Sequence, residues 1–281
     1  MWLSDPGAFE SLTDFPARTI WWRRSNETRA KRRNPLFDIV GVSVWTLVVD
    51  ILHCLFLGVA RDYCASVLWW FVQREIFIQG RPREETLALT VLQIRRVLWE
   101  WYPQETRRRP DETLTRLEDL VPSMLGPERK PEMSTKGAET KWFVYFCVFL
   151  LRRYEDNLDR VGKMLLRCGV ALMNIIDIYR DSPARLPPLK FQQSCDNLVN
   201  MLRYWEEAGI AFKPKTHLFV HLVLRAKWSG NPNHHSTFEG ESINKTLGTL
   251  GRMSHRMVWE LRVFAYFDKS QEDCASKRRR L

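Results

Sequence analysis

Apolar residues recur every three or four positions over most of this chain, and that spacing is the strongest constraint on its fold. Residues spaced in this way gather on one side of an α-helix, where they face a partner element. Three stripes show it clearly: Leu87, Val91, Ile94, Leu98 and Trp101; Val161, Leu165, Cys168, Leu172, Ile175 and Tyr179; Cys195, Leu198, Leu202 and Trp205. They predict a mainly α fold built as a multi-helix bundle.

Stretches rich in glycine, proline and charge separate the predicted helices. They lie at residues 80–82, 103–110, 125–131 and 182–188. Proline lacks the amide hydrogen that a helix needs, and glycine leaves the backbone unrestrained, so both commonly end helices. We therefore expect loops at all four places.

The hydrophobic and cysteine patterns restrict the class of protein. The longest apolar run, 142–151, has ten residues. A bilayer span needs about 20 residues, so this run predicts a buried helix, and no membrane partner is expected. The first residues lack the charged-then-apolar order of a signal peptide. The six cysteines form no close pair, which favours a reducing compartment and predicts neither disulfides nor a zinc knuckle.

Basic residues outnumber acidic ones by 43 to 33, and the excess is local. Residues 17–36 contain seven basic residues against one acidic residue, with Trp21 and Trp22 among them. Guanidinium groups neutralise phosphate and indoles stack on bases, so this arm fits DNA, and a solvated arm is the alternative. The basic runs 31–33 and 276–281 resemble nuclear import signals, which favours the nucleus over the cytoplasm.

A β-branched run with Asp50 and His53 at its end suggests a functional site. Val44, Val48 and Val49 predict a short buried strand, and the apolar spacing after His53 predicts a helix. A carboxylate at a strand end can bind a hard divalent cation, with a second carboxylate arriving on a helix. The alternative is that Asp50 caps the helix while His53 is hydrogen-bonded inside the core.

Five strings occur in a fixed order along the chain. They are NPLFDIVGV, VVDILHCLFLGVARD, MSTKGAETKWF, KPKTHLFVHL and GNPNHHSTFEGESINKTLG. From about residue 34 to about residue 267, this order resembles the C-terminal half of CACTA-type transposases. Those enzymes have an RNase H-like core in which three carboxylates hold two divalent ions, Mg²⁺ or Mn²⁺. The resemblance implies DNA as the partner, and a homo-oligomer is compatible with it.

The resemblance also implies roles for individual residues. Asp50 and Glu241 are the expected metal-binding catalytic carboxylates, with Glu239 as the alternative to Glu241, and His53 completes a D-x-x-H motif. The ions would activate a water and then a DNA 3′-hydroxyl for in-line displacement at phosphorus. We expect the carboxylates of Asp50 and Glu241 to lie about 4 to 8 Å apart. Two alternatives stay open: Asp50 is an accessory residue, and a Glu in a first helical turn interacts with the helix dipole alone.

One part of an RNase H-like core has no counterpart in this pattern. The first catalytic Asp should lie on a three-stranded meander, but the 49 residues before Asp50 are charged and turn-prone. Asp14, in the string TDFPA, is only a faint match. The expectation is therefore a truncated or decayed transposase fragment, with a small, incomplete RNase H-like α/β remnant, that is not catalytically competent alone.

Basic residues near these motifs are the expected DNA contacts, two of them on the loop predicted at 103–110. They are Arg32, Arg33, Arg107, Arg108, Lys213, Lys215, Lys245 and Arg252. His217 and His221 lie four residues apart, so they share one face of a helix that starts near residue 216. A role beside phosphates or in hydrogen bonds is expected for this pair ahead of zinc binding. His234 and His235 are expected in an exposed polar loop.

The sequence thus predicts five segments. They are a basic arm (1–36), a strand–helix remnant of the core (37–75), an insertion-like helical bundle (76–212), a C-terminal helical part with the late Glu (213–268) and a basic tail (269–281). Two other functions remain open. One is a domesticated, non-catalytic DNA-binding protein, and the other is a scaffold that docks protein through Trp142, Phe143, Tyr145, Phe146 and Phe149.

Overall fold

A computed structural model describes residues 48–253 continuously, together with 20–21, 32–33, 39–40, 258, 261–262, 264–266 and 269. For 20–21, 32–33, 239, 241, 242 and 251 it describes the backbone alone. The chain divides into two compact units, Met1–His235 and Ser236–Leu281. We describe each unit by itself.

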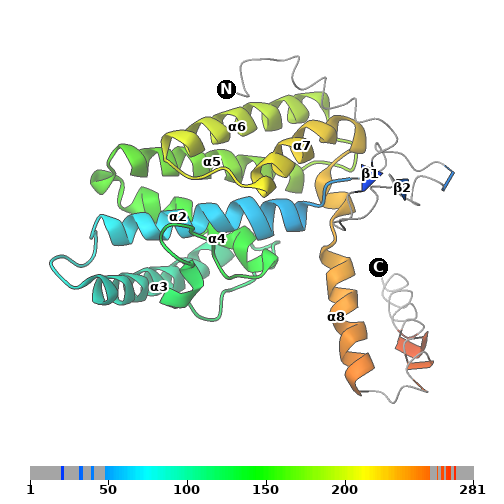
Figure 1. Ribbon diagram of the computed structural model, residues 1–281, viewed down its shortest axis with the longest axis horizontal. Helices are drawn as coiled ribbons and strands as arrows, with labels where there is room; N and C mark the ends of the chain where they lie inside the picture. Colours follow the sequence, from blue (N-terminus) through cyan, green and yellow to red (C-terminus); the bar gives the residue numbers. More distant parts are fainter. Residues whose placement is uncertain are drawn as a thin grey trace. The chain divides into compact units, whose positions relative to one another are not determined.

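The described residues are mainly helical, as predicted (Figure 1). The first unit contains a π-helical segment η3 (Leu52–Val59) that runs into α2 (Ala60–Gln73), followed by α3 (Arg83–Arg108), α4 (Gly137–Arg153), α5 (Arg160–Arg180), α6 (Pro188–Glu207) and α7 (Pro214–Ser229). Single 3₁₀ turns lie at η4 (Pro122–Leu125), η5 (Glu155–Asn157) and η6 (Pro232–His235). The two-residue strands β1 (Ile20–Trp21) and β2 (Arg32–Arg33) pair antiparallel, with Ile20 opposite Arg33. The second unit contains α8 (Phe238–Met253).

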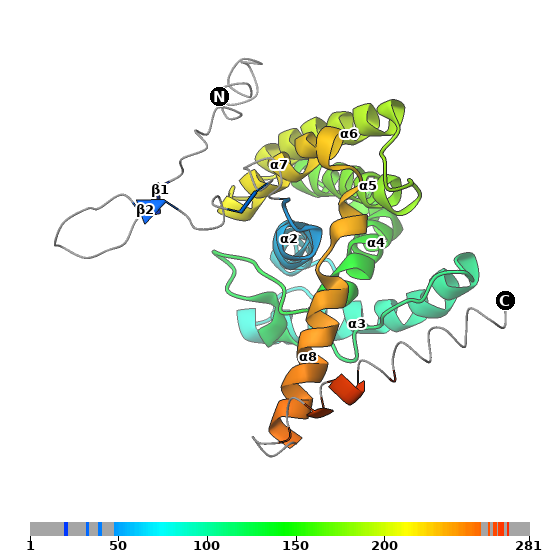
Figure 2. The same ribbon diagram turned by 90° about the vertical axis from the view of Figure 1, so that its right-hand side faces the viewer.

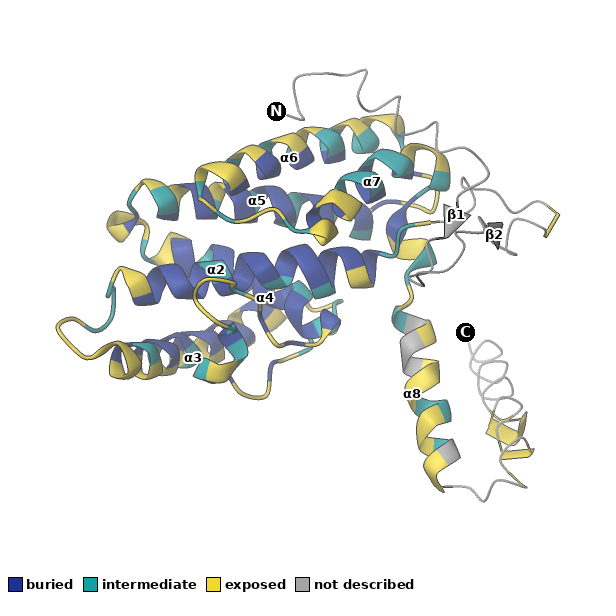
Figure 3. Ribbon diagram, viewed as in Figure 1, coloured by how far each residue is buried: buried dark blue, intermediate teal, exposed yellow. Residues whose placement is uncertain are grey.

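The helix formed by η3 and α2 lies at the centre of the first unit. Seen end-on in Figure 2, it is surrounded by other helices: α3, α4 and α5 contact α2, and α7 contacts η3. Figure 3 shows that the central helix is buried over almost its whole length, and Leu55, Val59, Tyr63 and Val67 have no exposed surface. A helix that is apolar on all sides belongs in a protein core or a bilayer. The segment Leu52–Gln73 is long and apolar enough to span a membrane, but 83% of its apolar 18-residue window is buried inside the fold.

The apolar stripes predicted from the sequence are confirmed as the faces that pack. Ile94, Leu98 and Trp101 of α3 are buried, as are Leu172 of α5 and Trp205 of α6. The run 142–151 is the buried part of α4, as expected. Its aromatic residues are not a docking surface, because four of the five are buried and Phe149 is half-buried. This removes the observation on which the scaffold function rested.

One predicted loop boundary is wrong. The loop expected at 103–110 begins too early, since α3 continues through Pro103 to Arg108. Pro103 and the preceding-turn residue Trp99 are both exposed, so the hydrogen bond that proline removes lies on the solvent side, where water can satisfy the carbonyl. The predicted division into five segments stays a prediction. The boundary between the two compact units lies after His235, and α7 packs against η3 in the first of them.

The small RNase H-like remnant stays a prediction. Of its expected strand around Val44, Val48 and Val49, residues 44–47 lie outside the described part, and residues 48–50 form neither helix nor strand. The predicted arm 1–36 and tail 269–281 also lie almost wholly outside that part.

Two glycines let α5 approach the central helix closely. A Cβ atom at Gly169 would lie 1.9 Å from the Tyr63 hydroxyl oxygen, and one at Gly162 would lie 2.7 Å from the Trp70 ring. The indole of Trp70 donates to Asp159, 3.0 Å away, and Asp159 also caps α5 through the Gly162 N–H. Burial would raise the pKa of Asp159, but these hydrogen bonds and the nearby charge of Arg74 lower it overall. The end of α2 and the start of α5 are thereby joined.

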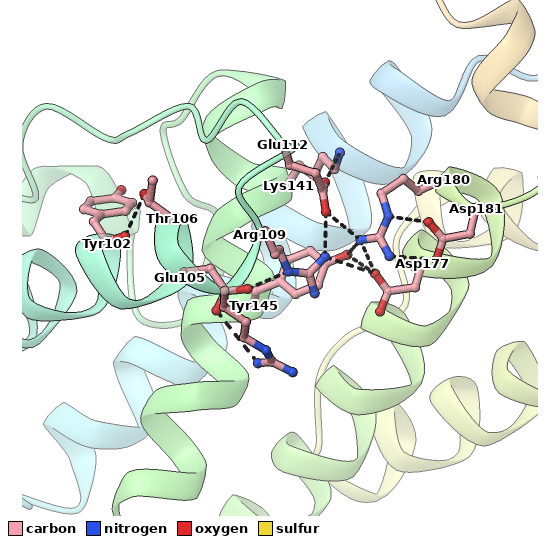
Figure 4. A network of polar contacts seen from close by, with 11 residues as sticks. Tyr102, Glu105, Thr106, Arg109, Glu112, Lys141, Tyr145, Asp177, Arg180 and Asp181 are labelled. Carbon is pink, nitrogen blue, oxygen red and sulfur yellow. Dashed lines mark hydrogen bonds and ion pairs between the residues drawn. The ribbon is translucent and has the colours of Figure 1, made fainter.

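A network of charged groups joins the ends of α3 and α5 to α4 (Figure 4). Arg109 donates to Glu105 at 2.7 Å and to Glu112 at 2.9 Å. Arg180 pairs with Asp177 at 2.6 Å, and the Tyr145 hydroxyl donates to the same carboxylate at 2.5 Å. Charge-assisted hydrogen bonds of this kind are stronger than neutral ones. Their cations therefore serve the fold, although they belong to the same basic excess that suggested DNA binding.

Replacing Gly169 with alanine should destabilise the first unit. The new methyl group would overlap Tyr63 and Val148 and force the helices apart, at a cost of about 1–3 kcal/mol. Chemical unfolding followed by circular dichroism measures the change.

The matched control is Tyr63→Phe. No hydrogen-bond partner is found for the Tyr63 hydroxyl among the described residues, so its removal should leave stability nearly unchanged. In the Tyr63→Phe background, Gly169→Ala should be less costly because the nearest clashing atom is gone. Equal costs in both backgrounds would contradict the close approach described here.

Candidate functional site

Asp50 and His53 form a compact pair at the start of the central helix. One Asp50 carboxylate oxygen accepts the His53 backbone N–H at 2.9 Å and lies 2.6 Å from His53 Nδ1. Ile51, directly before η3, already has helical backbone angles, so the D-x-x-H spacing places the histidine at the third helical position. There the backbone N–H has no partner within the helix, and a capping side chain commonly satisfies it. Asp50 is thus the N-cap of this helix, and the His53 imidazole binds the same carboxylate oxygen as the His53 backbone N–H.

The location of His53 differs from the capping alternative considered for the sequence. That alternative placed the ring inside the core, but the His53 side chain is 55% exposed, against 19% for Asp50. Position 53 faces outward because the apolar positions on either side of it, Leu52, Cys54 and Leu55, are the buried ones. In the neutral tautomer that donates from Nδ1 to Asp50, Nε2 is the acceptor nitrogen.

Three further ionisable residues gather around this pair. Burial, and next the charge of Asp50, raise the pKa of the Cys54 thiol to about 12, while Lys215 opposes the shift. Cys54 is therefore protonated at neutral pH and is a poor nucleophile. Burial lowers the pKa of His235, against the charge of Asp50. No local pattern links His235 to Asp50, because the two residues are far apart in the chain and only the fold brings the Asp50 charge within range of His235.

The lysines at the start of α7 are bound within the fold. Lys213 Nζ lies 2.7 Å from the carboxylate of buried Asp62 and 3.2 Å from the Pro131 carbonyl oxygen. Burial raises the pKa of Asp62, and its hydrogen bond from Lys213 counters that rise. Lys215 donates to the Leu57 carbonyl, and its Cδ would lie 2.6 Å from a Cβ at Gly58. Both lysines thus have structural contacts, and their predicted contact with DNA stays a prediction.

The other predicted DNA contacts lie in three places. Arg107 and Arg108 are exposed in the last turn of α3, not on a loop as expected. Lys245 and Arg252 are exposed on α8. Arg32 and Arg33 form β2, of which only the backbone is described.

The expected metal ligands Asp50 and Glu241 belong to different units of the structure. Glu239 and Glu241 lie in the first turn of α8, as expected, but their side chains are outside the described part, and Asp50 belongs to the other unit. The distance between Asp50 and Glu241 therefore stays a prediction.

Among the described side chains, no three His, Cys, Asp or Glu residues converge as metal ligands would. A hard cation such as Mg²⁺ needs several oxygen ligands, and Asp50 alone does not supply them. The expected partners of Asp50, which are Glu239 and Glu241, lie outside the described side chains, so the Mg²⁺ or Mn²⁺ site that the resemblance implies stays a prediction.

Comparison of the chain with models of protein families, with curated proteins and with solved structures finds no match.

Replacing Asp50 with alanine should cost about 1 kcal/mol of stability, the usual effect of losing an N-cap. Asp50→Asn keeps an acceptor for the His53 N–H and should lose less. Thermal or chemical unfolding of the two variants measures the difference. Unchanged stability in Asp50→Ala, together with lost Mn²⁺ binding, would instead identify Asp50 as a metal ligand.

Replacing Lys213 with methionine should reduce stability more than Asp50→Ala does, because it leaves the buried carboxylate of Asp62 without its cation. Removing one partner of a buried pair costs about 3–5 kcal/mol, whereas replacing both by apolar residues is often neutral. We expect Asp62→Leu combined with Lys213→Met to regain most of the loss in chemical unfolding. A Lys213→Met protein of normal stability that binds DNA weakly would contradict the structural role.

Proposed function

We propose that this chain is a DNA-binding protein derived from a CACTA-type transposase and that it does not cut DNA by itself. Two independent features support the proposal. One is a basic face on α8, and the other is the binding of the Asp50 carboxylate to His53 in the D-x-x-H motif.

The basic face of α8 is the observation that carries DNA binding. Lys245, Thr249 and Arg252 are exposed and follow each other at intervals of four and three residues, so they lie on one side of the helix. Leu247 and Leu250 fall on the opposite side and are less exposed. The Arg252 guanidinium lies 3.4 Å from the Thr249 hydroxyl, which holds the two polar groups together. Lysine, arginine and threonine side chains are typical ligands of DNA phosphates.

The Asp50–His53 pair supports the family and argues against cutting by this chain alone. The D-x-x-H spacing is part of the resemblance to transposases, and here it forms a capped helix start. Its carboxylate already accepts from the backbone and the imidazole of His53. A two-metal reaction needs carboxylates that bridge and surround the ions, and the described side chains offer no such group.

A nuclear location and a DNA partner agree with each other in this proposal. The net charge of +10 favours association with a polyanion, and both candidate import signals belong to that basic excess. A membrane has no part in the proposal, since the one helix among the described residues that is apolar enough to span it is mostly buried in the fold. Assembly into a homo-oligomer is compatible with it.

The double variant Lys245→Ala/Arg252→Ala tests the α8 face. Each lost phosphate contact should reduce the slope of log affinity against log salt by about 0.9, so the pair should reduce it by about 1.8. Fluorescence anisotropy with a labelled DNA duplex across a salt series measures the slope.

The matched control is Arg96→Ala/Lys163→Ala, which removes two exposed charges from the first unit. It should leave the slope nearly unchanged. Equal slopes for both double variants would show that binding depends on net charge rather than on α8. Strand cleavage by the purified wild-type chain in Mg²⁺ or Mn²⁺ would contradict the second half of the proposal.

A further inference from the structure

A pair of histidines on α7 has the geometry of a metal chelate. His217 and His221 lie one turn apart, and their Nε2 atoms are 2.9 Å from each other. Their rings meet edge to face at an angle of 80°, with centroids 4.6 Å apart. Both rings thus direct the same nitrogen to one point, where a single ion can bind both. Without metal, one neutral imidazole can donate to the other, which explains why the rings stay together.

We propose that His217 and His221 bind a divalent transition metal of the copper or nickel type. This site is separate from the Mg²⁺ or Mn²⁺ site implied by the transposase resemblance, and it does not depend on the proposed function.

The nitrogen separation favours a particular coordination geometry. Imidazole nitrogens bind such ions at about 2.0–2.1 Å. Two ligands at that distance and at a right angle are about 2.9 Å apart, whereas tetrahedral ligands are about 3.3 Å apart. The observed 2.9 Å therefore matches two adjacent positions of a tetragonal ion. Cu²⁺ and Ni²⁺ prefer this geometry with nitrogen ligands.

The surroundings of His221 favour the form of its imidazole that binds metal. Burial lowers the pKa of His221, and the neighbouring His217 and Arg225 lower it further. A neutral imidazole is the required ligand, because a proton on the coordinating nitrogen competes with the ion. The positive charge of Arg225 also opposes the ion directly, which favours moderate affinity.

The open side of the site also points to a labile ion. His217 is exposed and His221 half-buried, so solvent reaches the pair. No third His, Cys, Asp or Glu joins them among the described side chains. Structural metal sites are closed by four protein ligands, whereas sites with open positions leave room for water or another ligand. The pair therefore suits an exchangeable ion rather than one that holds the fold together.

Titration of the full-length chain with Cu²⁺ or Ni²⁺ alone tests the proposal. Isothermal calorimetry should give one Ni²⁺ per chain with a dissociation constant well below about 1 mM. The electron paramagnetic resonance spectrum of the Cu²⁺ form should show coupling to two imidazole nitrogens. Mg²⁺ should not compete, since it prefers oxygen ligands.

His217→Gln and His221→Gln should each weaken binding by at least the roughly 10–100-fold that loss of an outer-shell partner costs. The control is His234→Gln, because His234 is an exposed histidine in η6 and should not affect the site. Circular dichroism checks that each variant is folded. Binding of the same stoichiometry and affinity in His217→Gln and His221→Gln would overturn the proposal, as would wild-type binding weaker than about millimolar.

Discussion

The burial of one helix on nearly all sides is the constraint on which the rest of the first unit depends. The segment η3 and α2 can be surrounded only if its neighbours approach closely, and the glycines of α5 allow this opposite Tyr63 and Trp70. Its ends must also satisfy their polar groups. Asp50 does so at the start, and Asp159 joins Trp70 and Arg74 near the end. The site at the start of the helix is therefore also a part of the core's framework.

Some cations of this protein form ion pairs within the fold and others are free to face a ligand, and the net charge alone does not distinguish the two groups. Lys213 neutralises a buried carboxylate. Arg109 and Arg180 both pair with Asp177 of α5, which also accepts the hydroxyl of Tyr145 of α4. These cations stabilise the fold through their ion pairs, so replacing them with alanine would change stability more than ligand binding. Lys245 and Arg252 are exposed on one face of α8, where phosphates can reach them. A basic residue is thus best interpreted by what its cation contacts.

The D-x-x-H motif shows how one pattern satisfies two explanations at once. Its spacing belongs to the resemblance to transposases, and the same spacing places an aspartate and a histidine at the cap and third positions of a helix. A cap and an accessory residue are compatible roles, because a carboxylate that orients an imidazole can serve both stability and a nearby reaction. Metal binding would require further oxygen ligands, which a cap does not need.

Local spacing in the sequence determined the helices, their buried faces and most of the loops, because a 3.6-residue period records which side of a helix avoids water. It also identified Asp50 with His53, and His217 with His221, since residues three or four apart on a helix are neighbours. Only the tertiary structure decided that Lys213 meets Asp62, that His235 lies near Asp50 and that Gly169 meets Tyr63. Those contacts join residues far apart in the chain, and their geometry depends on how the helices pack.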